Sequence, residues 1–591
     1  MKESTLKGGE FLIKETKADD IFTPEDFTEE QKMMRDSVIE FVDREIVPAR
    51  ERLENKDFSL TEELMTKAGS LGFLGVGVPE EYGGMWMDYV SRMLVCDYIS
   101  GATGSFSTPF GAHTGIGTLP IVLYGSEKQL KDYVPKLASG EWFASYCLTE
   151  PGAGSDANSG KTKAVLSDDG THYKISGQKI WISNAGFAKL FIVFARIEDD
   201  KNITSFLVPY DPDNGITLGE EEKKLGINSS STRQVFFNET KVPIENILAN
   251  RGDGFKIAVN ALNVGRIQLG AACLEAQRRV ISISVKYANE RIQFKKPISQ
   301  FGAIKEKLAR MTTTCYVGES ATYRAANDID KKISSLKKDG LDMQKAELKG
   351  AEEFAIECSI LKVAISEDIQ NTSDDGIQIF GGMGFSAETP MEAAWRDSRI
   401  GRIYEGTNEI NRMLSVGMFL KKGMKGELDL MGAVLKCKKE INNYGNFDEK
   451  EIFGEEKQVL KNLKKVFLLL LGNSVEKFGP KIEERQQVLL SLSDMLIEIY
   501  FSESAMLRTE KNIAKENDQN IKIMMTKLYL FEAVEIILKK AKEIIPSISV
   551  TDKTRDIQKS IEKLCSYNIP NVIELKTKIA DKIISENKYC F

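Results

Sequence analysis

Three segments of this 591-residue chain carry residue types at spacings that could do chemistry. The first is Tyr146–Asp156, with the sequence YCLTEPGAGSD. One proline and two glycines let this backbone turn tightly and leave amide groups unpaired, which suits an anion such as a pyrophosphate. Thr149 and Ser155 add hydroxyl donors. The segment lacks the Gly-Lys-Ser/Thr ending of a P-loop and the glycine pattern of dinucleotide-binding folds, so by itself it is equally well a plain surface loop.

The second segment, Lys179–Asn184 (KIWISN), has the pattern of a strand end. Trp181 could flank a flat aromatic cofactor while the hydroxyl of Ser183 bonds a heteroatom of its ring. When such a segment is considered alone, a tryptophan that packs in the core is the commoner arrangement.

The third segment contains a candidate base. Gln378–Phe385 (QIFGGMGF) has three glycines in four residues, which allow a ligand to approach the backbone closely. Arg396–Asn408 ends in YEGTN, where Glu405 precedes a predicted helix. A carboxylate here could accept a proton, but acidic residues near helix N-termini also stabilise the helix, and in isolation that role is the commoner one.

Composition narrows the chemistry further. The two histidines are too few to build a histidine metal site or a Ser-His-Asp triad, so we expect no metal and look to carboxylates, backbone amides or a bound cofactor. The net charge of −7 disfavours nucleic acid as the main partner. The eight cysteines form no C-x-x-C pair, which is typical of reduced cytosolic thiols. The N-terminal residues lack the apolar core of a signal peptide, and the longest purely apolar run, Val466–Leu471, is too short to span a membrane, so a cytoplasmic protein is expected.

The elements that must position these segments change in character along the chain. Thr28–Gln31 (TEEQ) is a capping box, and helical spacing with Gly-rich connections continues to about residue 140. Short β-patterned runs follow, separated by Gly and Asn/Asp, and predict a small barrel or sandwich. These runs are Tyr173–Ile175, Lys179–Ile182, Leu190–Ile197, Ser205–Val208 and Val235–Phe237.

Helical spacing returns at about residue 255. One stripe runs from Leu269 to Tyr287, and long helices are predicted through Met343–Gln370 and Asn408–Leu420. The sequence therefore predicts a mainly α protein with a central β domain. Its four parts are an N-terminal helical domain (1–145), a middle β-barrel or sandwich (146–254), a four-helix bundle (255–425) and an extra C-terminal helical domain (430–591).

Together, the three segments resemble the signature regions of the acyl-CoA dehydrogenase family, in order and without a large gap over residues 28 to 425. The sequence Glu405-Gly406-Thr407-Asn408 is similar to that family's catalytic loop. The resemblance implies FAD bound between the β domain and the bundle. It also implies α,β-dehydrogenation of a fatty acyl-CoA to a trans-2-enoyl-CoA in β-oxidation, with electrons passed to electron-transferring flavoprotein. The alternatives are an acyl-CoA oxidase, another dehydrogenase of the same superfamily that acts on a different acyl group, and a catalytically idle relative that serves as an assembly or nucleic-acid-binding scaffold.

The resemblance also implies roles for individual residues. Glu405 matches the catalytic base; a minority of the family places that glutamate at the position of Gly265. Substrate contacts are implied for Ser155, Arg266 and Gly406. The implied FAD-binding residues are Tyr146, Leu148, Thr149, Gly154, Ser155, Trp181, Ile182, Ser183, Arg291, Gln293, Gln378, Gly381, Gly382, Thr407 and Glu409. The chain departs from the family where Phe294-Lys295 replaces a usual Phe-Gly and where Ala393 replaces a basic residue.

The helical tail resembles that of the very-long-chain branch, which implies a long acyl substrate. Family habit implies a homodimer or homotetramer. The small residues between Phe110 and Gly117 could leave a deep acyl pocket. An apolar stripe from Val459 to Leu471, beside three lysines, predicts either a helix packed on both sides or a peripheral membrane contact through the tail. Truncation near residue 430 is expected to leave FAD binding largely intact but to lower solubility or membrane association.

Overall fold

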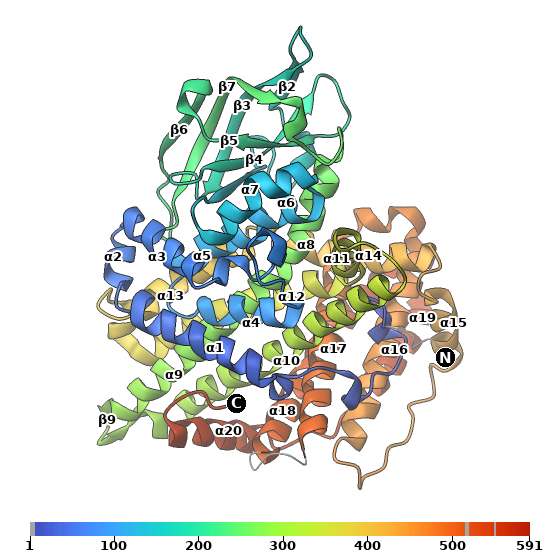
Figure 1. Cartoon of the computed structure of the whole chain (residues 1–591). Helices are drawn as coiled ribbons and strands as arrows, with labels where there is room; N and C mark the ends of the chain where they lie inside the picture. The colour runs from blue at the N-terminus through green and yellow to red at the C-terminus, as the bar shows by residue number, and fades with distance from the viewer. Residues whose placement is uncertain (1–5, 514–518, 549–550) are drawn as a thin grey trace.

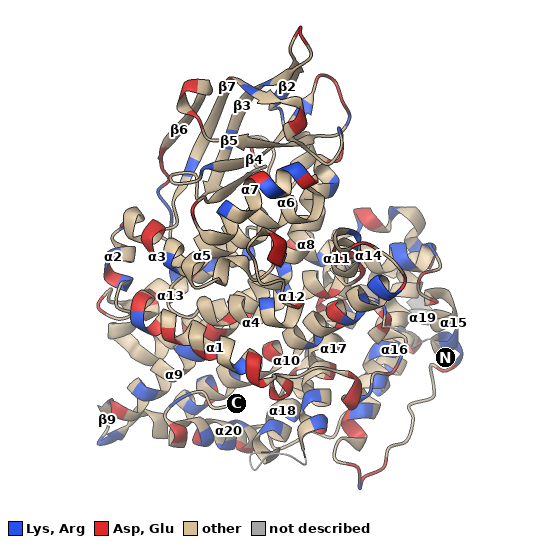
Figure 2. Ribbon diagram, in the orientation of Figure 1, with Lys and Arg blue, Asp and Glu red and all other residues tan. Residues whose placement is uncertain are grey.

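The computed structural model describes residues 6–513, 519–548 and 551–591. The predicted fold class is confirmed, because helices dominate the protein and the strands gather in one region between them. In Figure 1 the strands between residues 144 and 248 lie together at the top, β9 (Ile292–Gln293) lies apart at the lower left, and the C-terminal helices, in orange and red, lie at the lower right and along the bottom. Figure 2 shows acidic and basic residues interleaved over the helices.

The N-terminal part is helical, as predicted. Its helices are α1 (Glu29–Phe41), α2 (Arg50–Glu54), α3 (Phe58–Ser70), α4 (Tyr89–Ile99), α5 (Gly104–Gly111), α6 (Leu119–Tyr124) and α7 (Glu127–Ser139). The predicted capping box starts α1: the Thr28 hydroxyl accepts a hydrogen bond from the Gln31 amide at 3.2 Å, and the Gln31 side chain accepts one from the Thr28 amide at 3.1 Å. A π-helical stretch, Ala112–Thr118, joins α5 to α6.

Eight strands form the β domain. They are β1 (Ala144–Cys147), β2 (Lys163–Leu166), β3 (His172–Ser183), β4 (Leu190–Ile197), β5 (Thr204–Pro209), β6 (Ile216–Glu221), β7 (Thr232–Pro243) and β8 (Ile247–Leu248). The order is β6-β7-β3-β2-β4-β5-β8, and β1 pairs with β4 in parallel. Two of the predicted strands, 173–175 and 179–182, are one strand, β3, interrupted by bulges. The sequence pattern missed β1, β2, β6 and β8, which have at most six residues each; β2 and β6 are also only partly buried.

The bundle contains α8 (Gly254–Ala272), α9 (Leu274–Glu290), α10 (Gly302–Lys338), α11 (Met343–Glu353), α12 (Ala355–Phe380), α13 (Met391–Ser398) and α14 (Asn408–Met424). The predicted single stripe from Leu269 to Tyr287 is broken between α8 and α9, because the amide of Cys273 bonds the carbonyl of Gly270 in a tighter turn. The helix predicted from 343 to 370 is likewise divided at Phe354. The α8–α9 stretch 254–290 is long and apolar enough to cross a membrane, but most of its apolar window is buried in the bundle.

A two-residue turn joins β9 (Ile292–Gln293) to β10 (Lys296–Pro297) after α9. The turn residues are Phe294 and Lys295, with φ of +49° and +66°. Two successive positive φ values are typical of the tight hairpin turn that favours glycine. This chain therefore keeps the turn with lysine at the second position.

The C-terminal extension adds α15 (Leu430–Lys439), α16 (Gly454–Phe478), α17 (Gln486–Asn512), α18 (Gln519–Ile548), α19 (Thr551–Leu564) and α20 (Val572–Glu586). The helix α17 packs against α10 and α14, and α20 packs against α10. The stripe from Val459 to Leu471 lies on α16 and is buried, including Leu468 and Leu469. Of the two alternatives for this stripe, the structure shows the helix packed on both sides.

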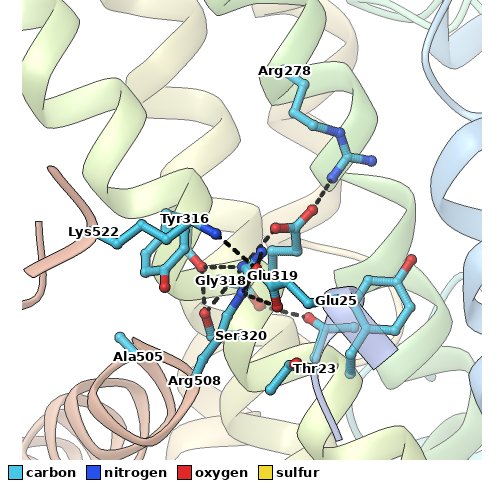
Figure 3. A network of polar contacts seen from close by, with 12 residues as sticks. Thr23, Glu25, Arg278, Tyr316, Gly318, Glu319, Ser320, Ala505, Arg508 and Lys522 are labelled. Atoms are coloured by element: carbon cyan, nitrogen blue, oxygen red, sulfur yellow. Dashed lines mark hydrogen bonds and ion pairs between the residues drawn. The ribbon is translucent and has the colours of Figure 1, made fainter. Parts of the chain in front are cut away.

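Buried ion pairs also join the extension to the rest of the protein (Figure 3). Arg508 of α17 lies 2.8 Å from the carboxylate of Glu25 near the N-terminus and 2.6 Å from that of Glu319 on α10. Arg278 of α9 bonds the same Glu319 at 2.9 Å. Since a buried charge that loses its partner is strongly destabilising, these pairs hold the extension in one position.

Candidate active site

A cavity of about 270 Å³ lies between α5, the α8–α9 pair and α13. Ser183, Gly265 and Glu405 are among the residues that line it. Small and apolar side chains line most of the remainder, including Gly111, Ala112, Ala272 and Ala276. From the predicted glycine-rich run, Phe110, Gly111, Ala112 and Ile116 reach the cavity, whereas His113 is buried against α7 and β1 through bonds to Leu137 and Ala144.

Glu405 occupies the loop before α14 in a left-handed conformation, with φ of +59°. Gly265 of α8 makes room for its side chain, because a Cβ at position 265 would lie 2.6 Å from the Glu405 Oε2 atom. That oxygen is buried and has no hydrogen-bond partner within the described part of the chain. Burial raises the pKa of Glu405 to about 7, against the opposing charges of Arg266 and Lys362. The carboxyl group is thus suited to accept a proton near neutral pH.

Side chains from three helices hold the backbone of this loop. The guanidinium of Arg266 donates to the Glu405 carbonyl at 3.3 Å and to Asn263 at 2.8 Å. Asn411 donates to the Gly406 carbonyl at 2.7 Å, and the Thr407 hydroxyl caps α14 by accepting from the Ile410 amide. Lys362, which sequence reasoning missed, donates to the Gly406 carbonyl from α12. Arg266, predicted to contact the substrate, here supports the main chain of the predicted base.

The glycine-rich loop after β1 is held by a buried ion pair that the sequence did not reveal. Lys179 Nζ lies 2.6 Å from the Glu150 carboxylate and also donates to the Leu148 carbonyl at 3.1 Å. The Glu150 carboxylate accepts hydrogen bonds from the amides of Lys161 and Thr162. Within this loop Gly154 and Ser155 are exposed, and a Cβ on Gly154 would meet nothing within 4 Å in the described structure. The loop backbone is therefore accessible to a ligand.

The β3 bulge presents Trp181 to the outside. Trp181 has φ of +59° and a side chain that is 56% exposed, beside Ser183 at the cavity. The amide of Ile180 donates to the Thr149 carbonyl, so the Leu148-Thr149 segment runs next to this strand end. Ile182 points the other way and packs in the β-domain core, which leaves only its main chain for a ligand.

Tyr146 of β1 is partly buried and packs against Phe194, with 4.9 Å between ring centroids. Its hydroxyl has no hydrogen-bond partner in the described residues, and it lies close enough to Glu405 for the two groups to interact electrostatically. An unsatisfied buried hydroxyl is costly, so this position is suited to a polar ligand atom.

A second group of predicted cofactor residues lies at one end of the bundle and does not line the cavity. Tyr287 of α9 stacks on Phe380 of α12, with 4.0 Å between ring centroids, and brings the two helix ends together. The exposed residues Arg291 and Gln293 follow α9; Gln378, Gly381 and Gly382 end α12. Thr407 and Glu409 begin α14 near the predicted base.

These features fit a flat ring system with a phosphate-bearing arm. Trp181 has an exposed ring two residues from Ser183, which lines the cavity, and the Tyr146 hydroxyl, which has no hydrogen-bond partner in the described residues, lies near Glu405. A Cβ atom added at Gly154, Gly381 or Gly382 would have no atom of the described residues within 4 Å, so a ligand can approach the backbone closely at these positions. The fit concerns FAD, the cofactor that the sequence resemblance implies.

Family models match most of the chain. Models described as the N-terminal, middle and C-terminal domains of acyl-CoA dehydrogenase match residues 28–141, 145–240 and 252–417. A further model described as an acyl-CoA dehydrogenase C-terminal domain matches residues 462–563, within the extension.

Among known proteins, the chain is 42% identical to the probable acyl-CoA dehydrogenase of Bacillus subtilis (strain 168), over 99% of this chain and 98% of that one. It is 38% identical to the human mitochondrial very long-chain specific acyl-CoA dehydrogenase, over 72% of this chain and 62% of the human protein. Among solved structures, an acyl-CoA dehydrogenase complexed with FAD from Bacillus anthracis matches with a TM-score of 0.96 and 42% identity, covering 99% of this chain and all of that one.

Proposed function

Because the chain belongs to the acyl-CoA dehydrogenase family and is an FAD-dependent acyl-CoA dehydrogenase, we propose that its substrates are long-chain fatty acyl-CoA thioesters and that Glu405 is the base. The observation that carries the assignment of Glu405 is that it lines the cavity with a buried carboxylate oxygen that has no hydrogen-bond partner among the described residues. FAD, when bound, accepts the hydride from the β-carbon of the substrate.

The residues of the chain act on the α-proton. The Glu405 carboxylate takes this proton, and its burial keeps it basic enough to do so. Gly265 keeps the space around the carboxylate free, and Arg266 and Asn411 fix the loop by its carbonyl groups. The cavity walls exclude water from the developing enolate.

Replacement of Glu405 by Gln tests this assignment. The amide keeps the size of the side chain but cannot accept the α-proton. We expect FAD and acyl-CoA to bind as in the wild type, and anaerobic flavin bleaching by acyl-CoA to slow by on the order of 10²–10⁴-fold. Glu62→Gln, at an exposed position on α3, is the matched control. Bleaching at the wild-type rate in Glu405→Gln would remove Glu405 from the reaction.

The proposed long acyl chain is supported by the small residues that line the cavity. Gly111 has an ordinary helical φ of −65°, and a Cβ there would meet nothing within 4 Å in the described structure, so its missing side chain leaves open space. Gly111→Leu should fill that space without straining the backbone. We expect this variant to lose at least about tenfold in kcat/KM for long acyl chains relative to short ones. An unchanged profile across a graded series of acyl-CoAs would refute the assignment of this cavity to the acyl chain.

Electron-transferring flavoprotein is the proposed electron acceptor and rests on the family resemblance. The enzyme, once reduced by acyl-CoA under anaerobic conditions, is mixed either with oxidised electron-transferring flavoprotein or with air-saturated buffer. Reoxidation that is much faster with the flavoprotein supports the proposal. Fast reoxidation by oxygen alone would instead make the protein an acyl-CoA oxidase.

A homo-oligomer, a dimer or a tetramer, is also proposed. The exposed aromatic residues Phe294 and Phe385, each 88% exposed, lie beside the predicted cofactor residues at the end of the bundle and support an interface there. Light scattering of the purified protein measures the number of chains. A Phe294→Asp/Phe385→Asp variant that stays associated would place the interface elsewhere.

A cytoplasmic location with a peripheral membrane contact through the extension completes the proposal. The α16 stripe is buried, so support for the contact comes from α15, where Met431 and Leu435 are 67% and 52% exposed and three lysines follow (Figure 2). Co-sedimentation with vesicles containing anionic lipid tests the contact, with Leu435→Asp as the variant expected to reduce it. Equal sedimentation of the wild type and the variant would exclude α15 as the site of membrane contact. Cell fractionation tests the cytoplasmic location.

A further inference from the structure

Lys362 of α12 is a buried cation beneath the loop that carries Glu405. Its side chain is fully buried, and its Nζ donates to the Gly406 carbonyl at 2.8 Å and to the Asn408 Oδ1 atom at 2.7 Å. Both partners lie within three residues of Glu405, whereas Lys362 is separated from them by more than forty residues in sequence. Nothing in the proposed reaction so far uses this lysine.

We propose that Lys362 is a positioning residue, which holds the Glu405 loop in its working conformation and keeps the Glu405 carboxylate available as a base. This inference rests on the proposed role of Glu405 and adds a second residue to it. Three observations support it: the geometry of the loop, the fixed orientation of Asn408, and the charges that surround the site.

The loop geometry needs an external constraint. Glu405 and Gly406 both have positive φ, +59° and +81°, and only the glycine adopts that conformation readily. Hydrogen bonds that involve an ionised group are roughly twice as strong as neutral ones. In its protonated form Lys362 therefore anchors the Gly406 carbonyl more firmly than the neutral amide of Asn411, which shares that carbonyl.

Asn408 extends this anchor into the start of α14. Its Oδ1 atom faces the donor Lys362, and its Nδ2 group donates to the Ser366 hydroxyl at 3.1 Å and to the Glu367 carboxylate at 2.9 Å. With a donor on one side and acceptors on the other, the amide has one favourable orientation. The first residue of α14 is thus fixed to α12 at both ends of its side chain.

The charge of Lys362 also acts on Glu405. The charged and titratable groups that face the Lys362–Glu405 pair are Arg266 from α8, Cys273 between α8 and α9, Glu367 from α12, Tyr146 from β1 and the neighbouring Tyr404. Arg266 and Lys362 lower the pKa of Glu405, against the larger effect of burial. Burial in turn lowers the pKa of Lys362 to about 7, and the Glu405 carboxylate opposes that shift. The ammonium and the carboxylate therefore stabilise each other's charged forms.

The test compares Lys362→Met, which removes the charge and the donor, with Lys362→Arg, which keeps the charge. Two quantities are measured on the FAD-loaded proteins: the pH dependence of kcat/KM, and the titration of the Glu405 carboxyl band by infrared difference spectroscopy, assigned with Glu405→Gln. In Lys362→Met we expect the apparent pKa from the kcat/KM profile and the pKa of the Glu405 carboxyl band each to rise by about one unit. We also expect kcat to fall by about 10- to 100-fold, with KM nearly unchanged. Lys362→Arg should retain a pKa close to that of the wild type.

Several outcomes would overturn the proposal. One is a Lys362→Met protein whose carboxyl titration and kcat match the wild type; another is a Lys362→Arg protein that behaves like Lys362→Met. If Lys362→Met does not retain FAD, Lys362→Gln, which keeps a neutral donor, is judged by the same two measurements. If neither neutral variant retains FAD while Lys362→Arg does, the lysine serves the fold rather than the base, and the proposal fails. Failure of the wild type to bleach with acyl-CoA would instead refute the proposed role of Glu405.

Discussion

At the residue scale, the space beside Glu405 is as important as the carboxylate. A Cβ at Gly265 would lie 2.6 Å from Glu405 Oε2 and 3.0 Å from its Cδ, so a methyl group there must displace the end of a flexible side chain. We expect Gly265→Ala to fold and bind FAD normally, but to lower kcat by on the order of 100-fold, because a misplacement of about 1 Å at a reacting group costs that much. Thermal unfolding, flavin content and stopped-flow bleaching measure the three properties. Gly111→Ala, at another cavity-lining position with open space around its Cβ, is the control and should retain most of its activity.

The raised pKa of Glu405 also predicts how stability depends on pH. The ordinary pKa of this carboxyl is 4.5, and its pKa in the folded protein is about 7. At pH values between the two, Glu405 is therefore protonated more often in the folded protein than in the unfolded chain. Stability from this group is therefore fully present below about 4.5 and is lost as the pH rises through about 7. Above that range, Glu405→Gln should melt at a higher temperature than the wild type, and near pH 4.5 the two should melt alike. A lower melting temperature for the variant at pH 8 would contradict the raised pKa.

At the element scale, the glycine-rich loop depends on the Lys179–Glu150 pair that joins it to β3. Lys179→Met leaves the Glu150 carboxylate buried without its cation, which costs about 3–5 kcal/mol for a pair this deeply buried. We expect the variant to unfold at lower denaturant concentration and to lose FAD during gel filtration. Lys161→Met is the control, since its side chain is exposed in the same loop. Full retention of FAD in Lys179→Met would show that this loop does not need the pair to hold a ligand.

Contacts between helices also join the loop that carries Glu405 to the C-terminal extension. Arg412 of α14 bonds Glu367 of α12 and, at 2.6 Å, Asp494 of the extension helix α17. Because Glu367 in turn accepts from Asn408, the start of α14 is tied through Arg412 to the extension. The extension therefore contributes to the support of the catalytic loop, in addition to covering the bundle.

At the scale of the whole molecule, the structure changes the expectation for truncation near residue 430. Loss of the extension would leave Glu319 without Arg508 and Arg324 without Glu503, all of them buried charges, and would uncover the apolar core that α10 shares with α17. A protein cut near residue 430 is therefore expected to be insoluble or unfolded, because the charged groups would lose their partners and the apolar surface would be exposed to water.

The Arg508 pairs make a quantitative prediction (Figure 3). Arg508→Met should lower the free energy of unfolding by about 3–5 kcal/mol, since it removes the buried cation that Glu25 and Glu319 share, although Glu25 keeps Lys522 and Glu319 keeps Arg278. Arg508 and Lys522 hold the pKa of Glu25 well below its ordinary value of 4.5, even though burial opposes this. The stability from this carboxylate is therefore present above pH 4.5 and is lost as the pH falls below it. Lys461→Met, in an exposed pair with Glu15, is the control and should change stability by less than about 1 kcal/mol. Equal denaturation midpoints for the two variants would show that the buried network contributes little.

The sequence by itself determined those features that depend on neighbouring residues. The capping box at Thr28, the helix start at Thr407, the change from helical to β spacing and the order of the family's segments are all properties of short stretches, because capping bonds and periodicity span only a few residues. These were enough to predict the fold class, FAD and the acyl-CoA dehydrogenase family. The individual cofactor contacts remain predictions.

Only the tertiary structure decided which distant groups meet. Gly265 makes room for Glu405, which lies about 140 positions further along the chain. Lys362 bonds the same loop across 44 positions, and Arg508 pairs with Glu25 across 483. In a sequence a buried lysine is indistinguishable from one on the surface, since charge type is visible but desolvation is not. Burial and the choice of partner arise when the helices pack, and packing turned an ordinary glutamate into a group with a pKa near neutrality.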